Sequence, residues 1–199
     1  MTDTEHSTIT NEYIAQIALS FIDKYGIEKL SFRKLSKVCG IPPMTILNRL
    51  ESKDKLMRAV LQIMLDENTS DAIPGETWQQ SLRRVAYVHR KMALSHPNAY
   101  MLFIQTPPFE SPVVEYTMRM FDIHLNQNLP ENMPFLFLSL MHSFVSGFQL
   151  VESYSVTINP DDLSDNARKF TALFNEEAFD RNLSIIIAGL EASYDLPKE

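Results

Sequence analysis

The sequence predicts an all-α protein with an N-terminal three-helix helix-turn-helix domain and a larger helical domain after it. Apolar residues recur at helical spacing from residue 10 to residue 194, and no alternating run is long enough to predict a strand. Residues 26–58 hold eight basic and three acidic residues around a break at 39–42, although the whole chain has a net charge of −7. Two short helices around a glycine turn on a basic surface are typical of a unit that enters the DNA major groove.

Charge and composition separate the two parts of the chain. Residues 1–60 carry a balance of +2 and residues 61–199 a balance of −9, so the two parts are expected to meet different partners. The single cysteine, Cys39, excludes an intramolecular disulfide and favours a reducing, cytoplasmic compartment. The purely apolar runs are far shorter than the roughly 20 residues of a membrane span, so no membrane partner is expected.

Capping residues predict where the helices of the N-terminal part begin and end. Residues 1–9 are polar and without pattern, which predicts a disordered arm. Short polar residues favour helix starts, and glycine and proline mark ends and first turns. The predicted helices are about 10–25 with Thr10 as cap and Gly26 as a left-handed stop, 32–39 with Ser31 as cap and Gly40 as stop, 43–49 opening with Pro43, and 52–68 with Ser52 as cap.

The spacing of apolar residues predicts which helix faces are buried. Positions at i, i+3, i+4 and i+7 share one face of a helix. The predicted buried residues are Ile14, Ile17, Ala18, Phe21, Ile22 and Tyr25 in the first helix, Phe32, Leu35 and Val38 in the second, and Leu56, Val60, Ile63 and Met64 in the fourth.

A polar linker at 69–77, which contains Pro74 and Gly75, predicts the boundary between a domain at 10–68 and a domain at 78–196. Beyond it the periodicity stays helical. In the helix at 78–95 one face carries Leu82, Val85, Ala86, His89, Met92 and Ala93. Further helices are predicted at about 98–104, 111–128 and 133–155, followed by a final helical region that ends near Tyr194.

The third helix is the predicted reader of DNA bases. Ile46 and Leu50 are needed inward, which leaves the intervening side chains for base edges, and Lys53 begins the fourth helix where it can hold a phosphate. Arginine paired with guanine is the most discriminating contact available. The alternative is that the unit is only a structural corner with a solvated basic face. The candidate base readers are Met44, Thr45, Asn48 and Arg49.

Three motifs carry a family resemblance: Gly26-Ile27-Glu28-Lys29-Leu30, Ser31-Phe32-Arg33-Lys34-Leu35-Ser36, and Gly40 to Leu56 ending in Ser52-Lys53-Asp54-Lys55-Leu56. On these motifs, residues 10–65 resemble the DNA-binding domain of the tetracycline repressor-like (TetR) family of transcriptional regulators. The resemblance extends the predicted DNA-binding set to Ser31, Arg33, Pro43, Met44, Thr45, Leu47, Asn48, Arg49 and Lys53.

The chain departs from the family pattern inside the third helix. Leu47 stands where the family usually has a tyrosine that contacts a phosphate, and leucine makes no hydrogen bond. Arg49 replaces a histidine or tyrosine, and its charge suits a phosphate or a guanine. Either the mode of DNA binding is altered or the binding is weaker than in relatives.

Residues 78–194 resemble the ligand-binding and dimerisation domain of the same family. The matching features are Trp78, Ser95-His96-Pro97, Phe144-Val145-Ser146-Gly147 and the terminal segment from Phe179 to Leu190. The resemblance implies that the last two long helices pair with their copies in a four-helix bundle of a homodimer. Independently, apolar residues cover more than one face of the helix at 133–155, which is more than the core of a monomer usually needs.

Flexible apolar side chains supply the expected lining of an effector pocket: Met92, Met101, Phe103, Met118, Met120, Phe121, Met141 and Phe144. Each of them alone also fits ordinary core packing. His89, His124 and His142 lie on or near apolar faces, and their alternatives are metal ligands, polar contacts to a ligand, or structural residues. The predicted ligand-binding set, without a metal, is His89, Met92, Phe103, Met120, Phe121, His124, Met141 and Phe144.

These observations predict a ligand-responsive DNA-binding transcriptional regulator, a repressor released from a palindromic operator by a small apolar or aromatic effector. The alternative is a TetR-fold protein with lost or altered DNA binding that acts through small-molecule or protein contacts. No G-x-S-x-G elbow, P-loop, H-E-x-x-H or glycine-rich dinucleotide motif is present, so neither an enzyme nor a cofactor is expected.

Overall fold

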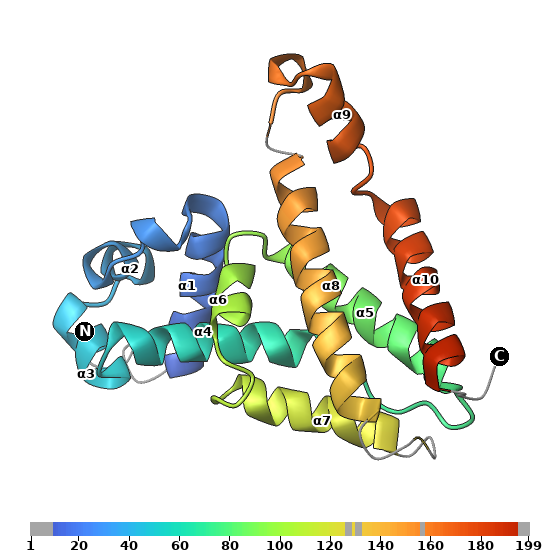
Figure 1. The fold of residues 1–199 in the computed structure, drawn as a ribbon. Helices are drawn as coiled ribbons and strands as arrows, with labels where there is room; N and C mark the ends of the chain where they lie inside the picture. Colours follow the sequence, from blue (N-terminus) through green and yellow to red (C-terminus); the bar gives the residue numbers. More distant parts are fainter. Residues whose placement is uncertain (1–9, 126–128, 130–132, 156–157, 195–199) are drawn as a thin grey trace. The chain divides into compact units, whose positions relative to one another are not determined.

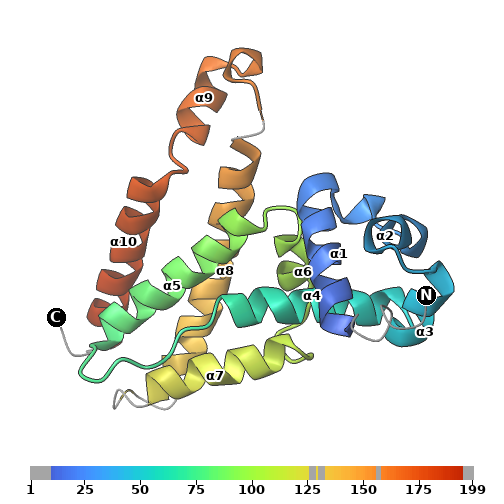
Figure 2. The same cartoon turned by 180° about the vertical axis from the view of Figure 1, so that it is seen from behind.

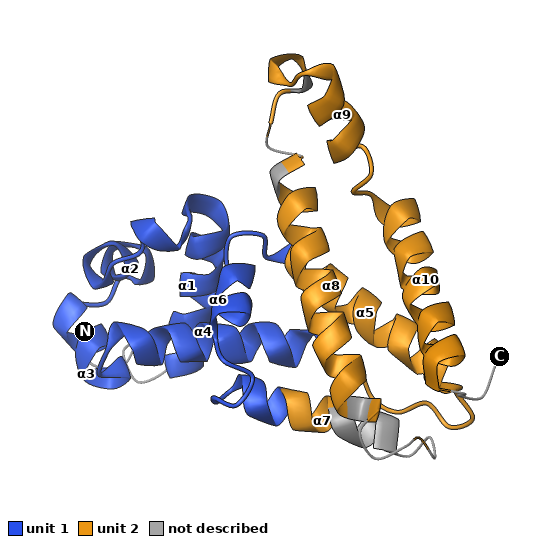
Figure 3. Cartoon of the chain, in the orientation of Figure 1, with its two compact units in different colours: residues 1–69, 95–116 blue, residues 70–94, 117–199 orange. Residues whose placement is uncertain are grey.

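The computed structural model describes residues 10–125, 129, 133–155 and 158–194. Within these ranges the regular elements are α-helices and 3-10 helices, and there are no strands (Figure 1). The all-α prediction is confirmed. The chain divides into two compact units, residues 1–69 with 95–116 and residues 70–94 with 117–199 (Figure 3). Each unit has its own helices and its own core.

Local caps set the helices of the first unit. Thr10 accepts a hydrogen bond from the Tyr13 amide, and Gly40 ends the second helix in the left-handed conformation at φ 70° and ψ 18°. Gly26 also has a positive φ of 85°, but its ψ of 152° lies outside the left-handed helical region, so α1 does not end in the predicted left-handed residue. The helices of this unit are α1 (Asn11–Tyr25), α2 (Phe32–Cys39), α3 (Pro43–Leu50), α4 (Lys53–Glu67) and α6 (Tyr100–Gln105), together with the start of α7 (Val113–Leu125).

The buried face of α1 is rotated from the predicted one. Ala15 and Leu19 are buried, whereas Tyr25 is exposed and Phe21 is half-buried. In α2, Val38 is 57% exposed although it was expected inward. The physical reason is that α1 carries apolar residues on two adjoining faces, and the face that packs on α4 is the one that loses water. The buried side chains of α1 are Ile14, Ala15, Ala18, Leu19 and Ile22.

The second unit is built from longer helices around one core. Aromatic and aliphatic side chains of α5, α8 and α10 meet there, with Trp78 stacked on Phe137 at 5.1 Å between ring centroids. Figure 2 shows α5 and α10 side by side, as the ion pair between Arg83 and Asp180 requires. The helices are α5 (Trp78–Ser95), most of α7, α8 (Met133–Ser155), α9 (Asp165–Thr171) and α10 (Glu176–Tyr194).

The two units divide the chain differently from the boundary predicted at 69–77. The chain passes into the second unit at residue 70, but residues 95–116 return to the first. Side-chain contacts tie this returning segment to the N-terminal helices. Tyr116 donates to the Asn68 carbonyl at 3.2 Å, Arg58 donates to the Ser111 carbonyl at 2.6 Å, and His96 contacts Asp23.

Part of α8 meets the length and composition of a membrane span. The segment is Phe135–Ser153, with a mean hydropathy of 1.3 and 33% of it buried. One such helix is weak grounds for a membrane, because core helices of soluble proteins have the same character. In α8 the apolar residues Phe137, Met141 and Val145 fill the core of the second unit.

Candidate nucleic-acid interface and effector site

Helix α2 and the turn that joins it to α3 are fixed by residues whose roles were predicted. The Ser31 hydroxyl accepts a hydrogen bond from the Lys34 amide at 3.3 Å, which satisfies the first turn of α2. Gly40 supplies the left-handed residue that ends α2, and Pro42 with Pro43 starts α3 at a position where no N–H is needed. The predicted helix boundaries at this turn are confirmed.

The two buried side chains of α3 decide which of its residues meet solvent. Ile46 and Leu50 are 0% and 5% exposed, so α3 is held in one rotational setting against the unit. Met44 is 62% exposed, and Asn48 and Arg49 are exposed beside it. The remaining candidates of this helix that point partly inward are Thr45 and Leu47, both half-buried, and Pro43 at its start is exposed.

A strained turn joins α3 to α4. Glu51 has a φ of 63°, a value that non-glycine residues seldom adopt, and its amide donates to the Leu47 carbonyl at 2.6 Å. Ser52 then caps α4 by accepting from the Lys55 amide at 3.1 Å. This tight turn, which the sequence did not reveal, brings the exposed Lys53 to the first position of α4. Charged groups at such a helix start sit beside unsatisfied N–H groups that suit a phosphate.

Some basic side chains of residues 26–58 are bound within the protein and are not available for DNA. Arg58 is bound to the Ser111 carbonyl and to the Glu110 carboxylate, at 2.6 and 3.2 Å. Lys55 pairs with Glu51 within one turn of helix. Arg33 at the start of α2 remains exposed.

An open groove of about 410 Å³ lies between the end of α1 and the outer face of α2. It is lined by apolar and basic side chains, Phe21, Tyr25, Lys29, Lys34, Lys37 and Val38. The exposure of Val38, which differs from the predicted inward position, is therefore part of a surface depression shared with lysines. The three lysines add positive potential to the first unit.

Several predicted ligand-binding residues lie in the interior of the second unit. Met92, Met120 and Met141 are each no more than 1% exposed. His89 is buried, and this burial, with a smaller contribution from the nearby His142, lowers the pKa of the His89 imidazole to about 4. Burial also lowers the pKa of His142. The interior of this unit therefore holds neutral imidazole rings at neutral pH.

The other members of the predicted ligand-binding set do not all lie in the interior of the second unit. Phe144 is half-buried and stacks on Phe179 with ring centroids 5.1 Å apart. Phe103 belongs to the first unit, where it packs on Tyr100 and Tyr116. Phe121 and His124 are on α7, but their side chains lie outside the described residues, and Met118, also expected in the lining, is 53% exposed.

A buried polar cluster in the second unit escaped the sequence analysis. Arg90 and Glu152 form an ion pair at 2.6 Å, and Gln149 donates to the other Glu152 oxygen at 2.7 Å. All three side chains are buried, and the Arg90 guanidinium lies 5.4 Å from the centroid of the Phe179 ring. The sequence held one indication that Arg90 is buried, because Arg90 follows Ala86 by one turn on the same face of the helix. That the Glu152 carboxylate on α8 lies opposite Arg90 is seen only in the structure.

Metal ligation finds no support in the part of the chain that the structure describes. Within it, no three histidine, cysteine, aspartate or glutamate side chains lie close enough together to hold an ion. His89 and the nearby His142 have no third such ligand among the described side chains.

Large apolar side chains are exposed on α8 and α10. Phe135 and Ile185 are each 64% exposed, and Leu150 and Tyr194 are 42% and 51% exposed. The small residues of these helices, Gly147, Ala188 and Gly189, are exposed too. Small exposed residues permit close helix approach, and exposed apolar side chains of this size are more than a solvated helix face usually carries.

The second half of the chain matches a known family. A family model described as the Tetracyclin repressor-like, C-terminal domain matches residues 72–175, which is more than half of the chain. The tetracycline repressor protein class E of Escherichia coli is 32% identical over 97 residues, an alignment that covers 48% of this chain and 46% of the relative. The chain thus spans about half the length of the curated relatives that it matches.

Solved structures share the fold over nearly the whole chain. A variant of TetR from Acinetobacter baumannii AYE in complex with minocycline has a TM-score of 0.74 at 19% identity and covers 96% of this chain and 97% of its own. BioQ in complex with its double-stranded DNA operator has a TM-score of 0.68 at 16% identity, with 93% and 99% covered. At these identities the likeness is one of fold.

Proposed function

This chain belongs to the tetracycline repressor-like (TetR) family of transcriptional regulators, and from that premise we propose that it is a homodimeric repressor, released from a palindromic operator by a small effector. The observation that carries the proposal is the setting of α3. Ile46 and Leu50 anchor that helix in the core while Met44, Asn48 and Arg49 stay exposed. A helix held rigidly with polar side chains outward is what base reading in the major groove requires.

The phosphate contacts of the proposal rest on helix starts and basic side chains. Ser31 and Arg33 open α2, and Lys53 opens α4. The structural relative BioQ, whose structure contains its operator DNA, supports a DNA partner for this fold. The single free Cys39 suits a reducing compartment, so the proposal includes a cytoplasmic location.

DNA binding is tested with the DNA that flanks the gene of this protein. Fluorescence anisotropy measures the dissociation constant in a series from about 50 to about 200 mM salt. A dimer that holds several phosphates should lose affinity about a thousandfold or more over that range, because neutralised phosphates release counterions. If the protein does not bind this DNA, or if the affinity does not change with salt, the proposed repressor function is wrong.

The alternative function keeps one specific observation in its favour. Leu47 occupies the place of the phosphate-binding tyrosine of the family, and its half-buried apolar side chain offers no hydroxyl. If the flanking DNA does not bind, the chain acts through small-molecule or protein contacts instead. Leu47→Tyr separates the two functions, since a gain in DNA affinity of about threefold to tenfold would show that the mode of binding is retained and only weakened.

The homodimer is proposed through α8 and α10. Phe135 and Ile185 are exposed apolar side chains on these helices, and an isologous interface between two copies would remove both from water. Sedimentation should show a dimer for the wild type and a monomer for Ile185→Asp. Phe109→Asp is the matched control, because Phe109 is 76% exposed but lies in the first unit. A dimer that survives Ile185→Asp and Phe135→Asp would exclude this interface.

An apolar or aromatic effector is proposed for the second unit. The buried Met92, Met120 and Met141 supply adaptable apolar contacts, and neutral imidazoles at His89 and His142 disfavour a phosphate. Thermal unfolding should shift upward with apolar aromatic compounds, since a ligand of the folded state stabilises it by mass action. Upward shifts that occur only with sugars or sugar phosphates would contradict this chemistry.

A further inference from the structure

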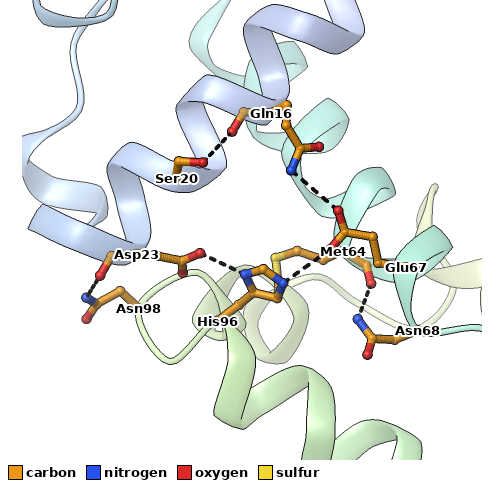
Figure 4. A network of polar contacts seen from close by, with 8 residues as sticks. All are labelled: Gln16, Ser20, Asp23, Met64, Glu67, Asn68, His96 and Asn98. Atoms are coloured by element: carbon orange, nitrogen blue, oxygen red, sulfur yellow. Dashed lines mark hydrogen bonds and ion pairs between the residues drawn. The ribbon is translucent and has the colours of Figure 1, made fainter. Parts of the chain in front are cut away.

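His96 stands at the point where the chain leaves the second unit for the first. Helix α5 ends at Ser95, and His96 follows directly in a segment that belongs to the first unit. Its side chain is 14% exposed and lies between two carboxylates of the first unit (Figure 4). The imidazole Nδ1 is 2.7 Å from Asp23 Oδ2 on α1, and Nε2 is 3.4 Å from Glu67 Oε2 on α4. We name these three residues the His96 clamp.

Two neighbouring side-chain amides bind the acids of the clamp. Asn98 donates through Nδ2 to the backbone carbonyl oxygen of Asp23 at 2.8 Å, and Gln16 Nε2 donates to the Glu67 carboxylate at Oε1 at 3.4 Å (Figure 4). These amides are neutral, so the charged groups that face the ring are Asp23 from α1 and Glu67 from α4. The clamp thus joins three segments that are far apart in sequence.

The clamp joins two helices through one side chain. A carboxylate accepts hydrogen bonds and donates none, so an N–H of the His96 ring is the donor that suits it. The Nδ1 contact with Asp23 at 2.7 Å is within hydrogen-bond distance, and the Nε2 contact with Glu67 at 3.4 Å is looser.

The clamped helices in turn position the reader of DNA. Helix α1 packs against α2, α3 and α4, and α4 begins three residues after the end of α3. We propose that His96 is a positioning residue for operator binding: through its contacts with Asp23 and Glu67 it ties α1 to α4 in the DNA-binding arrangement. This inference rests on the proposed function, for which it supplies a residue that holds the two helices around the reader of DNA.

The first test compares two neighbouring acids of α4. Glu67→Gln removes one carboxylate of the clamp, and Asp66→Asn is the matched control because Asp66 is an exposed acid that binds Gln62 instead. Loss of a negative charge in a DNA-binding unit ordinarily strengthens DNA binding. We expect Glu67→Gln to weaken binding to the gene-flanking DNA about fivefold, and Asp66→Asn to leave it equal or tighter. Equal or tighter binding in both variants would overturn the proposal.

The second test removes the ring itself. His96→Gln should weaken DNA binding about tenfold, within the range of ordinary allosteric couplings. Circular dichroism checks that the variant is folded. Unchanged DNA binding in folded His96→Gln would contradict the positioning role of His96.

A third test needs no DNA and separates this proposal from the proposed function. Amide hydrogen exchange in the last turns of α1 and α4 should accelerate in His96→Gln, with α10 unchanged. If wild type fails to bind DNA but this result holds, the proposed function fails and the clamp stands. Unchanged exchange in α1 and α4 of His96→Gln overturns the clamp.

Discussion

Helices α2, α3 and α4 of the first unit and the interior of the second unit are fixed by contacts of different sequence range. In the first, a chain of caps sets α2, α3 and α4 within a few residues of one another, and Ser31, Gly40 and Ser52 each act on their own turn. In the second, long helices meet through residues far apart in sequence, as Arg90 meets Glu152. Local chemistry therefore defines the face that is proposed to read DNA, while distant pairing defines the interior of the second unit.

The buried ion pair of the second unit gives the largest expected effect. Glu152→Leu leaves Arg90 buried without its carboxylate and should lower the free energy of unfolding by about 3–5 kcal/mol in urea denaturation. The double variant Arg90→Met with Glu152→Leu should regain most of that loss, because no charge remains buried. The exposed pair of Arg168 with Asp165 is the control, and Arg168→Gln should cost less than about 1 kcal/mol. Equal losses in the two single variants would show that long-range pairing is no more important here than surface charge.

Acid should destabilise the second unit through His89. Because burial lowers the pKa of His89 from 6.5 to about 4, the unfolded chain binds the proton more readily between those values. The stabilisation is therefore complete above about pH 6.5 and is lost as the pH falls towards 4, by up to about 3 kcal/mol. Urea denaturation of wild type and His89→Gln across this range measures the difference. A wild type and variant with parallel pH profiles would contradict the burial of a neutral ring.

Two basic residues of the first unit should separate base reading from phosphate binding. Arg49→Ala should relax discrimination at one operator base pair by about 1–3 kcal/mol if Arg49 reads a guanine. Lys53→Ala should weaken binding to all sequences alike and reduce the salt slope by about one. Binding of both variants to an operator library at two salt concentrations gives the answer. Uniform weakening by both would assign Arg49 to a phosphate.

Loss of a cap gives the smallest expected effect. Ser31→Ala removes the acceptor of the Lys34 amide and should lower the free energy of unfolding by about 1 kcal/mol. Ser20→Ala is the control, because the Ser20 hydroxyl only bonds back to the Gln16 carbonyl within α1. Thermal denaturation compares the two. A larger loss from Ser20→Ala would mean that local caps do not govern the first unit.

Helix positions followed from sequence more closely than helix faces did. The predicted ranges of α5 and α8 are confirmed at Trp78–Ser95 and Met133–Ser155, because both have breakers at their ends and unbroken helical spacing between. The face of α1 was wrong at Tyr25 and missed Leu19, since spacing alone cannot rank two adjoining apolar faces. The final helical region separates into α9 and α10 at the turn after Thr171.

The candidate sites show the same limit. Ile46 and Leu50 were predicted inward and are buried, which left Met44, Asn48 and Arg49 exposed as expected. Phe103, which is predicted to line the effector site, lies on α6, and α6 packs with α4 in the first unit. The sequence shows that Phe103 is apolar and helical, and it contains no record of which neighbouring helix removes it from water.

By itself, the sequence determined the all-helical class, the caps and stops around α2 and α3, and the two-part division of charge. These features depend on groups within about one helical turn of each other or on composition, so they can be predicted without knowing the fold. Tertiary structure alone decided that Arg90 meets Glu152 and that His96 lies between Asp23 and Glu67. Those pairs join residues more than 25 positions apart. Which side chain a charged residue meets at such a separation is decided only when the helices that carry the two residues pack together.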